Sequence, residues 1–243
     1  CFRDEDLRAD RQPEFTQIDI EMSFVSEEGV LQTMESMIRN LFQEVLSDQL
    51  PDPFIRLSYE DAMARFGTDR PNLGVAMELV DVGDLMRQVE FNVFSGPAND
   101  KDSRVACLKL KNAKNITRKQ IDDYTNFVGE FGAKGLAYIK VEDISTGADG
   151  LQSPILKFLD EKTIHSLIER LALANGDIVF FGADKISIVN ASLGALRVKL
   201  AEDFDQMNSG WFPLWITDFP MFNWDEKEKR WVAKHHPFTA PKV

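Results

Sequence analysis

The chain has 243 residues, and its 28 lysines and arginines against 40 aspartates and glutamates give a formal net charge of −12. This length suffices for one or two domains with a sizeable core, and the charge argues against nucleic-acid binding through the whole surface. The two cysteines provide neither a disulfide framework nor metal-ligand spacing, which fits a reducing cytoplasm. The sequence contains no signal peptide and no apolar run long enough to span a bilayer. We therefore expect a globular cytoplasmic protein and, because the chain starts without a methionine inside an expected strand, a piece of a longer one.

The first 24 residues read as two extended runs joined by a charged loop. Residues 15–24 alternate with a period of two, which predicts a half-buried strand. The apolar residues of one face are Ile18, Ile20, Met22 and Phe24. If the short first run pairs antiparallel with this strand, the opposite face carries Arg3, Glu5 and the ring of Phe15. A solvent-exposed face has the same composition, but a large ring beside ionic groups favours a ligand that stacks on it.

The loop at residues 6–14 is too long for a two-residue hairpin turn and is rich in arginine and aspartate. Arginine binds phosphate with a rigid fork of donors, an aromatic ring stacks on a base, and acids bind amines. Arg3, then Glu5, then Phe15 after the loop therefore predict a nucleotide site.

A resemblance to a known family rests on these same residues. Phe2-Arg3-Asp4-Glu5, followed by Arg11 and Phe15, resembles the second signature motif of the class II aminoacyl-tRNA synthetases. The string Phe15-Thr16-Gln17-Ile18-Asp19 is similar to bacterial aspartyl-tRNA synthetases in particular. The resemblance continues along the chain and implies an α+β fold, in which part of the antiparallel-sheet catalytic core of a class II synthetase is interrupted by a separate α/β insertion domain.

After the two paired runs, Ser26 and two acids precede apolar residues at helical spacing. This pattern predicts a long amphipathic helix that packs against the back of the sheet formed by the two runs. Its stripe consists of Val30, Met34, Met37, Leu41 and Val45. Pro51 and Pro53 are expected to end this helix, and a shorter helix is expected between Ser58 and Gly67. Residues 69–73 read as a loop with a solvated ion pair. In the family, a similar segment lies where the catalytic domain is interrupted.

Residues 74–207 predict interleaved strands and helices that pack as an α/β layer pair with its own core. Strands are expected at 91–94, 105–111, 136–141 and 178–181, the last closed by Gly182-Ala183-Asp184. Helices are expected at 81–89, after the capping box that starts at Thr117, around residues 164–171, and at 186–200. This stretch resembles the bacterial insertion domain named for its Gly-Ala-Asp sequence. It shows no nucleophile, base or metal cluster, and His165 reads as an ordinary surface or packing histidine.

Residues 211–220 predict an apolar strand, and a charged turn at 225–230 leads to a return strand that starts at Trp231. This strand leads to His235-His236-Pro237-Phe238-Thr239, a string that the family places beside its amino-acid pocket. Adjacent histidines on a strand point to opposite faces and cannot both serve one small site equally. The expected domains are residues 1–73 (catalytic, first part), 74–207 (insertion) and 208–243 (catalytic, return strands).

The resemblance implies activation of L-aspartate with ATP to aspartyl-adenylate, followed by transfer to the terminal ribose of tRNA. Arg3 would bind the α-phosphate and the substrate carboxylate, and Phe15 would stack on adenine. The implied site residues are catalytic Arg3 and Glu5; ATP-binding Arg3, Asp4, Glu5, Gln12 and Phe15; aspartate-binding Arg3, Gln17, Asp19, His235 and His236; and tRNA-binding Asp6, Arg8 and Arg11.

The implied partners are L-aspartate, ATP as substrate, the tRNA acceptor end and a second copy in a homodimer, with neither membrane nor DNA. Mg²⁺ is implied as well, with ligands largely beyond Val243 and none expected in this chain. The first motif, the glycine-rich third motif, the flipping loop with its lysine and the anticodon-binding β-barrel are not in the sequence. We therefore expect the parent to be an enzyme and this polypeptide alone not to aminoacylate tRNA.

Two other interpretations stay open. The chain could be a non-catalytic module, in which the insertion domain contacts tRNA or has a structural role. It could also belong to an asparaginyl or lysyl ligase, against which the insertion domain argues, or to a synthetase paralogue with altered specificity. Aspartate-dependent pyrophosphate exchange by the full-length parent separates these interpretations.

Overall fold

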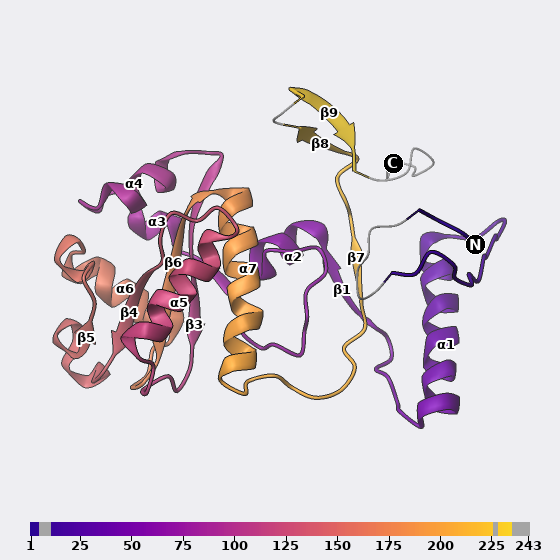
Figure 1. Cartoon of the computed structure of the whole chain (residues 1–243), viewed down its shortest axis with the longest axis horizontal. Helices are drawn as coiled ribbons and strands as arrows, with labels where there is room; N and C mark the ends of the chain where they lie inside the picture. Colours follow the sequence, from indigo (N-terminus) through magenta and orange to yellow (C-terminus); the bar gives the residue numbers. More distant parts are fainter. Residues whose placement is uncertain (5–10, 226–227, 235–243) are drawn as a thin grey trace. The chain divides into compact units, whose positions relative to one another are not determined.

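The computed structural model describes residues 1–4, 11–225 and 228–234 (Figure 1). The chain divides into two compact units, Cys1–Phe54 and Ile55–Val243, each with its own architecture. The boundaries predicted after residues 73 and 207 both fall inside the second unit and stay predictions. Among the described residues, no helix combines the length and the apolar character that crossing a membrane requires.

The first unit contains helix α1 (Glu27–Leu46), which begins as the sequence predicts. The hydroxyl of Ser26 accepts a hydrogen bond from the backbone N–H of Gly29 at 3.2 Å. The helix ends at Leu46, followed by Ser47 in the left-handed conformation (φ 59°), before either proline. Buried Glu35 accepts a hydrogen bond from the backbone N–H of Phe54 at 3.1 Å, which ties the segment after the helix back to it.

The predicted strand at residues 15–24 is wrong for this structure. Phe2 and Glu14 form an isolated antiparallel bridge, and none of residues 15–24 belongs to a strand. A strand needs neighbours for its backbone groups and its apolar face, and the described part of the first unit contains no sheet. The apolar face is accordingly exposed, at Ile18, Ile20, Met22 and Phe24. Val30, Leu41 and Val45 of the α1 stripe are exposed as well.

The core of the second unit is an antiparallel sheet of five strands in the order β2–β3–β6–β4–β5. The strands are β2 (Leu79–Asp81), β3 (Ser103–Leu110), β4 (Ala137–Val141), β5 (Leu151–Gln152) and β6 (Ile178–Lys185). The central strands β3 and β6 pair over eight residues, from Ser103 opposite Lys185 to Leu110 opposite Ile178. Alternate residues point to opposite faces, so that Leu108 enters one core cluster and Cys107 the other.

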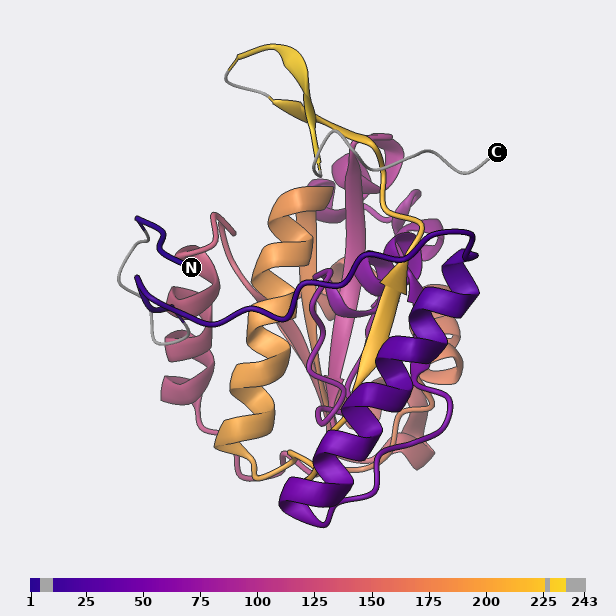
Figure 2. The ribbon, with the colours of Figure 1, turned by 90° about the vertical axis from the view of Figure 1, so that its right-hand side faces the viewer.

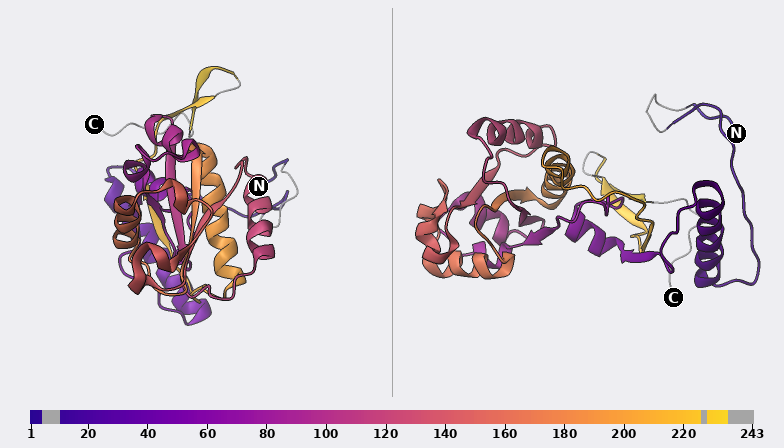
Figure 3. Two further views of the ribbon diagram at one scale, coloured as in Figure 1. Left: turned by 90° about the vertical axis from the view of Figure 1, so that its left-hand side faces the viewer. Right: turned by 90° about the horizontal axis from the view of Figure 1, so that it is seen from below.

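Helices cover both faces of this sheet (Figures 1 and 3). On one face pack α5 (Arg118–Gly129) and α7 (Ile186–Asp203), with Val128 and Leu193 in the core. On the other face pack α3 (Gly83–Met86), α4 (Asn92–Asn99) and α6 (Glu161–Leu171). Two 3₁₀ helices, η1 (Ile144–Gly150) and η2 (Leu156–Phe158), complete the connections. The α/β packing expected for this stretch is present, and the predicted capping box at Thr117 is formed.

Two strand predictions in this stretch are wrong. Residues 91–94 lead into α4, and the carbonyl of Phe91 accepts helical hydrogen bonds from the N–H groups of Phe94 and Ser95. A short apolar run does not distinguish a strand from a helix by its pattern alone. Strand β6 does not close at Gly182 but continues to Lys185, because β3 pairs with it along its whole length.

Strands β1 (Ile55–Ser58) and β7 (Leu214–Thr217) lie on either side of this stretch in sequence and pair in parallel. Ser58 caps helix α2 (Tyr59–Phe66) by accepting from the N–H of Asp61 at 3.0 Å. Gly67 ends α2 with φ 71°, and a Cβ there would lie 2.3 Å from the carbonyl oxygen of Asn190 in α7. Glycine is therefore required both for the backbone conformation and for the close approach of the two helices.

A buried arginine connects α7 to the chain that follows α2. Arg197 is 1% exposed and donates hydrogen bonds to the carbonyl oxygens of Met77, Val75 and Asn72, the last at 2.7 Å. Its guanidinium carbon lies 4.8 Å from the centroid of the Phe66 ring. Burial lowers the pKa of Arg197 to about 10, so the group is still charged at neutral pH.

The last described residues form a hairpin of β8 (Phe222–Asp225) and β9 (Arg230–Ala233), which contains the return strand predicted from Trp231 (Figure 2). The strand predicted at 211–220 is present as the shorter β7, which pairs with β1 and not with the return strand. The rings of Trp224 and Trp231 meet edge to face with centroids 5.6 Å apart. After the hairpin, the Lys234 ammonium lies 3.6 Å from the carboxylate of Asp69 and 5.3 Å from the ring centroid of Tyr59. These contacts tie the hairpin to α2 and to the loop after it.

The two cysteines differ sharply in environment, which gives a first prediction. Cys107 in β3 is 0% exposed and burial raises the pKa of its thiol to about 12, whereas Cys1 is exposed. At pH 8 we expect a thiol reagent to modify Cys1 at once and Cys107 only as fast as the second unit opens. Peptide mapping by mass spectrometry, with and without denaturant, measures both rates. Prompt modification of native Cys107 would contradict the closed core.

Candidate nucleotide-binding site

The predicted site starts where the first residues of the chain pair with residues 13–15. The N–H of Arg3 donates to the carbonyl oxygen of Pro13 at 2.9 Å, and the N–H of Phe15 donates to that of Cys1 at 3.0 Å. The α-amino group of Cys1 donates in turn to the carbonyl oxygen of Phe15 at 2.7 Å. The antiparallel pairing of the two runs is therefore confirmed over this short stretch, although the strand predicted beyond it is not.

This pairing brings Arg3 and Phe15 together. The guanidinium carbon of Arg3 lies 5.4 Å from the centroid of the Phe15 ring, within the range of a cation–π contact. Arg3 is exposed and Phe15 is half-buried. An exposed guanidinium can form paired hydrogen bonds with a phosphate, and a ring face can stack on a flat base. Arg3 and Phe15 thus place a phosphate-binding group and a base-stacking ring side by side.

The other predicted residues fall into two groups. Asp4, Arg11, Gln12, Gln17 and Asp19 are described and exposed. The amide oxygen of Gln17 accepts a hydrogen bond from the thiol of Cys1 at 2.8 Å, which places its side chain beside the paired stretch. The predicted site residues Glu5, Asp6, Arg8, His235 and His236 lie outside the described residues, and their roles stay predictions.

The described ranges contain no group of three or more histidine, cysteine, aspartate and glutamate side chains that could hold a metal ion. The family resemblance implies Mg²⁺ ligands largely beyond Val243, and we assign none of the described residues to the ion.

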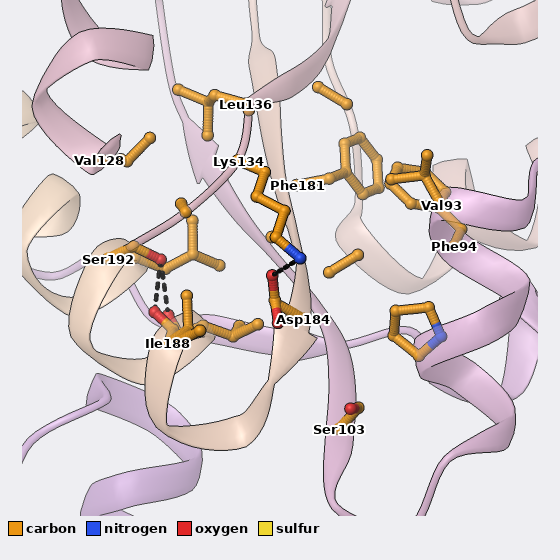
Figure 4. A pocket seen from close by; sticks show the side chains of 18 of the residues that line it. Val93, Phe94, Ser103, Val128, Lys134, Leu136, Phe181, Asp184, Ile188 and Ser192 are labelled. Atoms are coloured by element: carbon orange, nitrogen blue, oxygen red, sulfur yellow. Dashed lines mark hydrogen bonds and ion pairs between the residues drawn. The ribbon is translucent and has the colours of Figure 1, made fainter. Parts of the chain in front are cut away.

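The sequence did not predict a cavity of about 700 Å³ in the second unit, at the end of β6 (Figure 4). Its apolar lining includes Val93, Phe94, Val128, Leu136, Phe181 and Ile188. Lys134 and Asp184 form an ion pair at 3.9 Å along it. The hydroxyl of Ser192 donates to the carbonyl oxygen of Ile188 at 2.7 Å. These contacts occupy the polar groups with one another and offer no activated nucleophile.

Gly182, Ala183 and Asp184 line this cavity as part of β6. The pairing of β4 with β6 begins only at Ala137 opposite Phe181, so β4 does not cover this end of the strand. Glycine inside a strand often marks a place where another group approaches closely, and a Cβ at Gly182 would lie 3.1 Å from the side chain of Leu193 in α7. The prediction that this tripeptide closes the strand is therefore wrong.

Comparison with known proteins identifies the family. Residues 1–243 match the family model described as tRNA synthetases class II (D, K and N). The chain belongs to the class II tRNA synthetases. This confirms the resemblance inferred from the second motif.

The synthetase chain is also similar to full-length proteins. It is 54% identical over 241 residues, 99% of its length, to a protein named Aspartate--tRNA(Asp/Asn) ligase from Legionella pneumophila subsp. pneumophila (strain Philadelphia 1). It is equally similar to a protein of the same name from Legionella pneumophila strain Corby. Both matches cover 41% of the relative, so the chain spans about two fifths of the length of these proteins.

Proposed function

We propose that the synthetase chain is part of an aspartate–tRNA ligase. In this reaction a carboxylate oxygen of L-aspartate attacks the α-phosphorus of ATP and pyrophosphate leaves. A ribose hydroxyl of tRNA then attacks the acyl carbon of the aspartyl-adenylate, and AMP leaves. The observation that carries the proposal is the contact of Arg3 with Phe15 on the segment that bears the second motif of the family. The names of the two relatives support aspartate as the amino acid.

The chemistry of the first step needs alignment and charge stabilisation more than a base, because the attacking carboxylate is already ionised. Arg3 stabilises the developing charge on the α-phosphate and orients the substrate carboxylate. Phe15 stacks on adenine, a contact worth roughly 1–3 kcal/mol in nucleic-acid sites. Asp4, Glu5 and Gln12 contact the rest of ATP.

Gln17 and Asp19 face the amino group of aspartate, and His235 helps to hold the amino acid. Asp6, Arg8 and Arg11 contact the acceptor end of the tRNA. The full-length protein acts in the cytoplasm as a homodimer.

We also propose that residues 74–207 form an insertion domain within the catalytic core. The parallel pairing of β1 with β7 supports this, because it joins the chain before the stretch to the chain after it. The sheet β2–β6 and its helices lie between these two strands in sequence, with their own two core clusters.

Exchange of labelled pyrophosphate into ATP by the full-length protein tests the proposal. We expect exchange with L-aspartate and none with asparagine or lysine, since the first step needs no tRNA. Exchange with asparagine or lysine alone would contradict the amino-acid specificity. The absence of exchange with all three amino acids would contradict an enzymatic role and favour the non-catalytic module.

A further inference from the structure

A concentrated basic segment runs from the end of β3 into the first turn of α5, on a chain whose net charge is strongly negative (Figure 1). Residues 109–119 contain no acid, and their cationic residues are Lys109, Lys111, Lys114, Arg118 and Lys119. We refer to residues 111–119, which are the connection after β3 and the first two residues of α5, as the basic loop. A nucleic acid is repelled by most of a surface with a charge of −12 and is attracted where cations are gathered.

The basic loop is held in a fixed conformation by the core beneath it. Ala113 and Ile116 are buried in the cluster between the sheet and α5. The N–H of Ala113 donates to the carbonyl oxygen of Gly176 at 2.7 Å, and the N–H of Ile116 donates to that of Ala113 at 3.0 Å. The ammonium of Lys140 donates to the carbonyl oxygen of Ile116 at 3.1 Å. The loop backbone is thus already ordered before any partner binds.

Three lysines on this ordered backbone are exposed: Lys111, Lys114 and Lys119. Across the described part of the chain, their ammonium groups form neither an ion pair nor a hydrogen bond. Arg118 differs, because it lies 3.5 Å from the carboxylate of Asp122. The three lysines therefore do not have to give up an internal ion pair in order to bind an anion.

The neutral residues between these lysines can bind the same phosphate and sugar groups as the lysines. Asn112, Asn115 and Thr117 are exposed, and Asn and Thr side chains, like Lys, donate hydrogen bonds to phosphate and sugar oxygens. RNA helices offer both groups, since their shallow groove displays 2′-hydroxyls between two phosphate backbones. The basic loop contains no exposed aromatic residue that would stack on an unpaired base.

We propose that Lys111, Lys114 and Lys119 of the second unit bind the phosphate backbone of a double-helical part of an RNA. The identification of that RNA as tRNA rests on the proposed function. The contact is independent of sequence and contributes to affinity and orientation rather than to the chemical step.

The test compares tRNA binding by the full-length protein and by its K111Q/K114Q/K119Q variant, using fluorescence anisotropy from 50 to 200 mM salt. We expect the slope of log K against log salt to become shallower by about two units, because each lost phosphate contact changes it by roughly 0.7–0.9. The same relation predicts roughly 100-fold weaker binding at 0.1 M salt. The matched control K101Q/K157Q/K162Q removes the same charge from three exposed lysines outside the basic loop.

We expect the control variant to bind nearly as tightly as the unmodified protein, and circular dichroism to show both variants folded. An unchanged slope in the K111Q/K114Q/K119Q variant, or an equal loss in the control, would overturn the proposal. Pyrophosphate exchange separates this failure from that of the proposed function. The unmodified protein must show aspartate-dependent exchange if the function is right, and the K111Q/K114Q/K119Q variant must retain it.

Discussion

Replacing Arg3 with alanine is expected to lower kcat/KM for aspartate-dependent pyrophosphate exchange by about 100- to 1000-fold in the full-length protein. Preorganised groups that stabilise charge in the transition state have effects of this size. The guanidinium beside Phe15 is exposed and placed to bind a phosphate, and alanine removes its charge and its fork of donors together. Steady-state exchange kinetics at saturating aspartate measure the loss.

Three variants sharpen this test. Arg3→Lys keeps the charge without the planar fork, so we expect an intermediate loss. Phe15→Ala should raise the KM for ATP by roughly 5- to 150-fold, the equivalent of 1–3 kcal/mol of stacking. Arg87→Ala, which removes an exposed arginine of the second unit, should leave exchange unchanged. If Arg3→Ala stayed within twofold of the unmodified protein, the assignment of the phosphate contact would be wrong.

The second large effect concerns the stability of the second unit. Arg197→Met is expected to lower its free energy of unfolding by about 3–5 kcal/mol. Methionine fills part of the volume but leaves the carbonyl oxygens of Asn72, Val75 and Met77 without their donor. Buried acceptors that lose their partner cost about 1–3 kcal/mol each, and the contact with Phe66 is lost as well.

Urea denaturation followed by circular dichroism measures this change, with modification of Cys107 as a specific reporter for the second unit. The matched control is Arg118→Ala, which removes an exposed pair of the i,i+4 type. Such pairs contribute well under 1 kcal/mol. A change below 1 kcal/mol for Arg197→Met would show that the arginine network does not hold α7 to residues 72–77.

Elements with local signals were predicted correctly from the sequence. The caps at Ser26, Ser58 and Thr117 each depend on a hydrogen bond to a backbone group three residues away, so a few residues determine them. The helices that follow these caps were found for the same reason. The return strand at Trp231 was found as well, but its partner β8 was not.

Features that depend on distant partners were missed. The length of β6 is set by its pairing with β3, and no residue near Gly182 indicates that pairing. Burial of Arg197 requires residues 72–77 to lie beside α7, which no local pattern predicts. The cavity beside Asp184 likewise forms from α4, β6, α7 and the chain before β4, which come together only in the fold.

The candidate site shows the same division. The pairing that places Arg3 beside Phe15 was predicted from the alternation of residues and the motif, and the structure contains it. The extended strand beyond Phe15 was not found, because the described part of the first unit contains no sheet with which it could pair. The contributions of Glu5, His235 and His236 fall outside the described residues and rest on the family motif alone.

The most direct test of the nucleotide site is a crystal structure of the full-length protein with a non-hydrolysable analogue of aspartyl-adenylate. We predict that adenine stacks on the Phe15 ring and that the Arg3 guanidinium bonds the group that replaces the α-phosphate. Density for the analogue elsewhere, with Phe15 and Arg3 free of contact to it, would contradict the account.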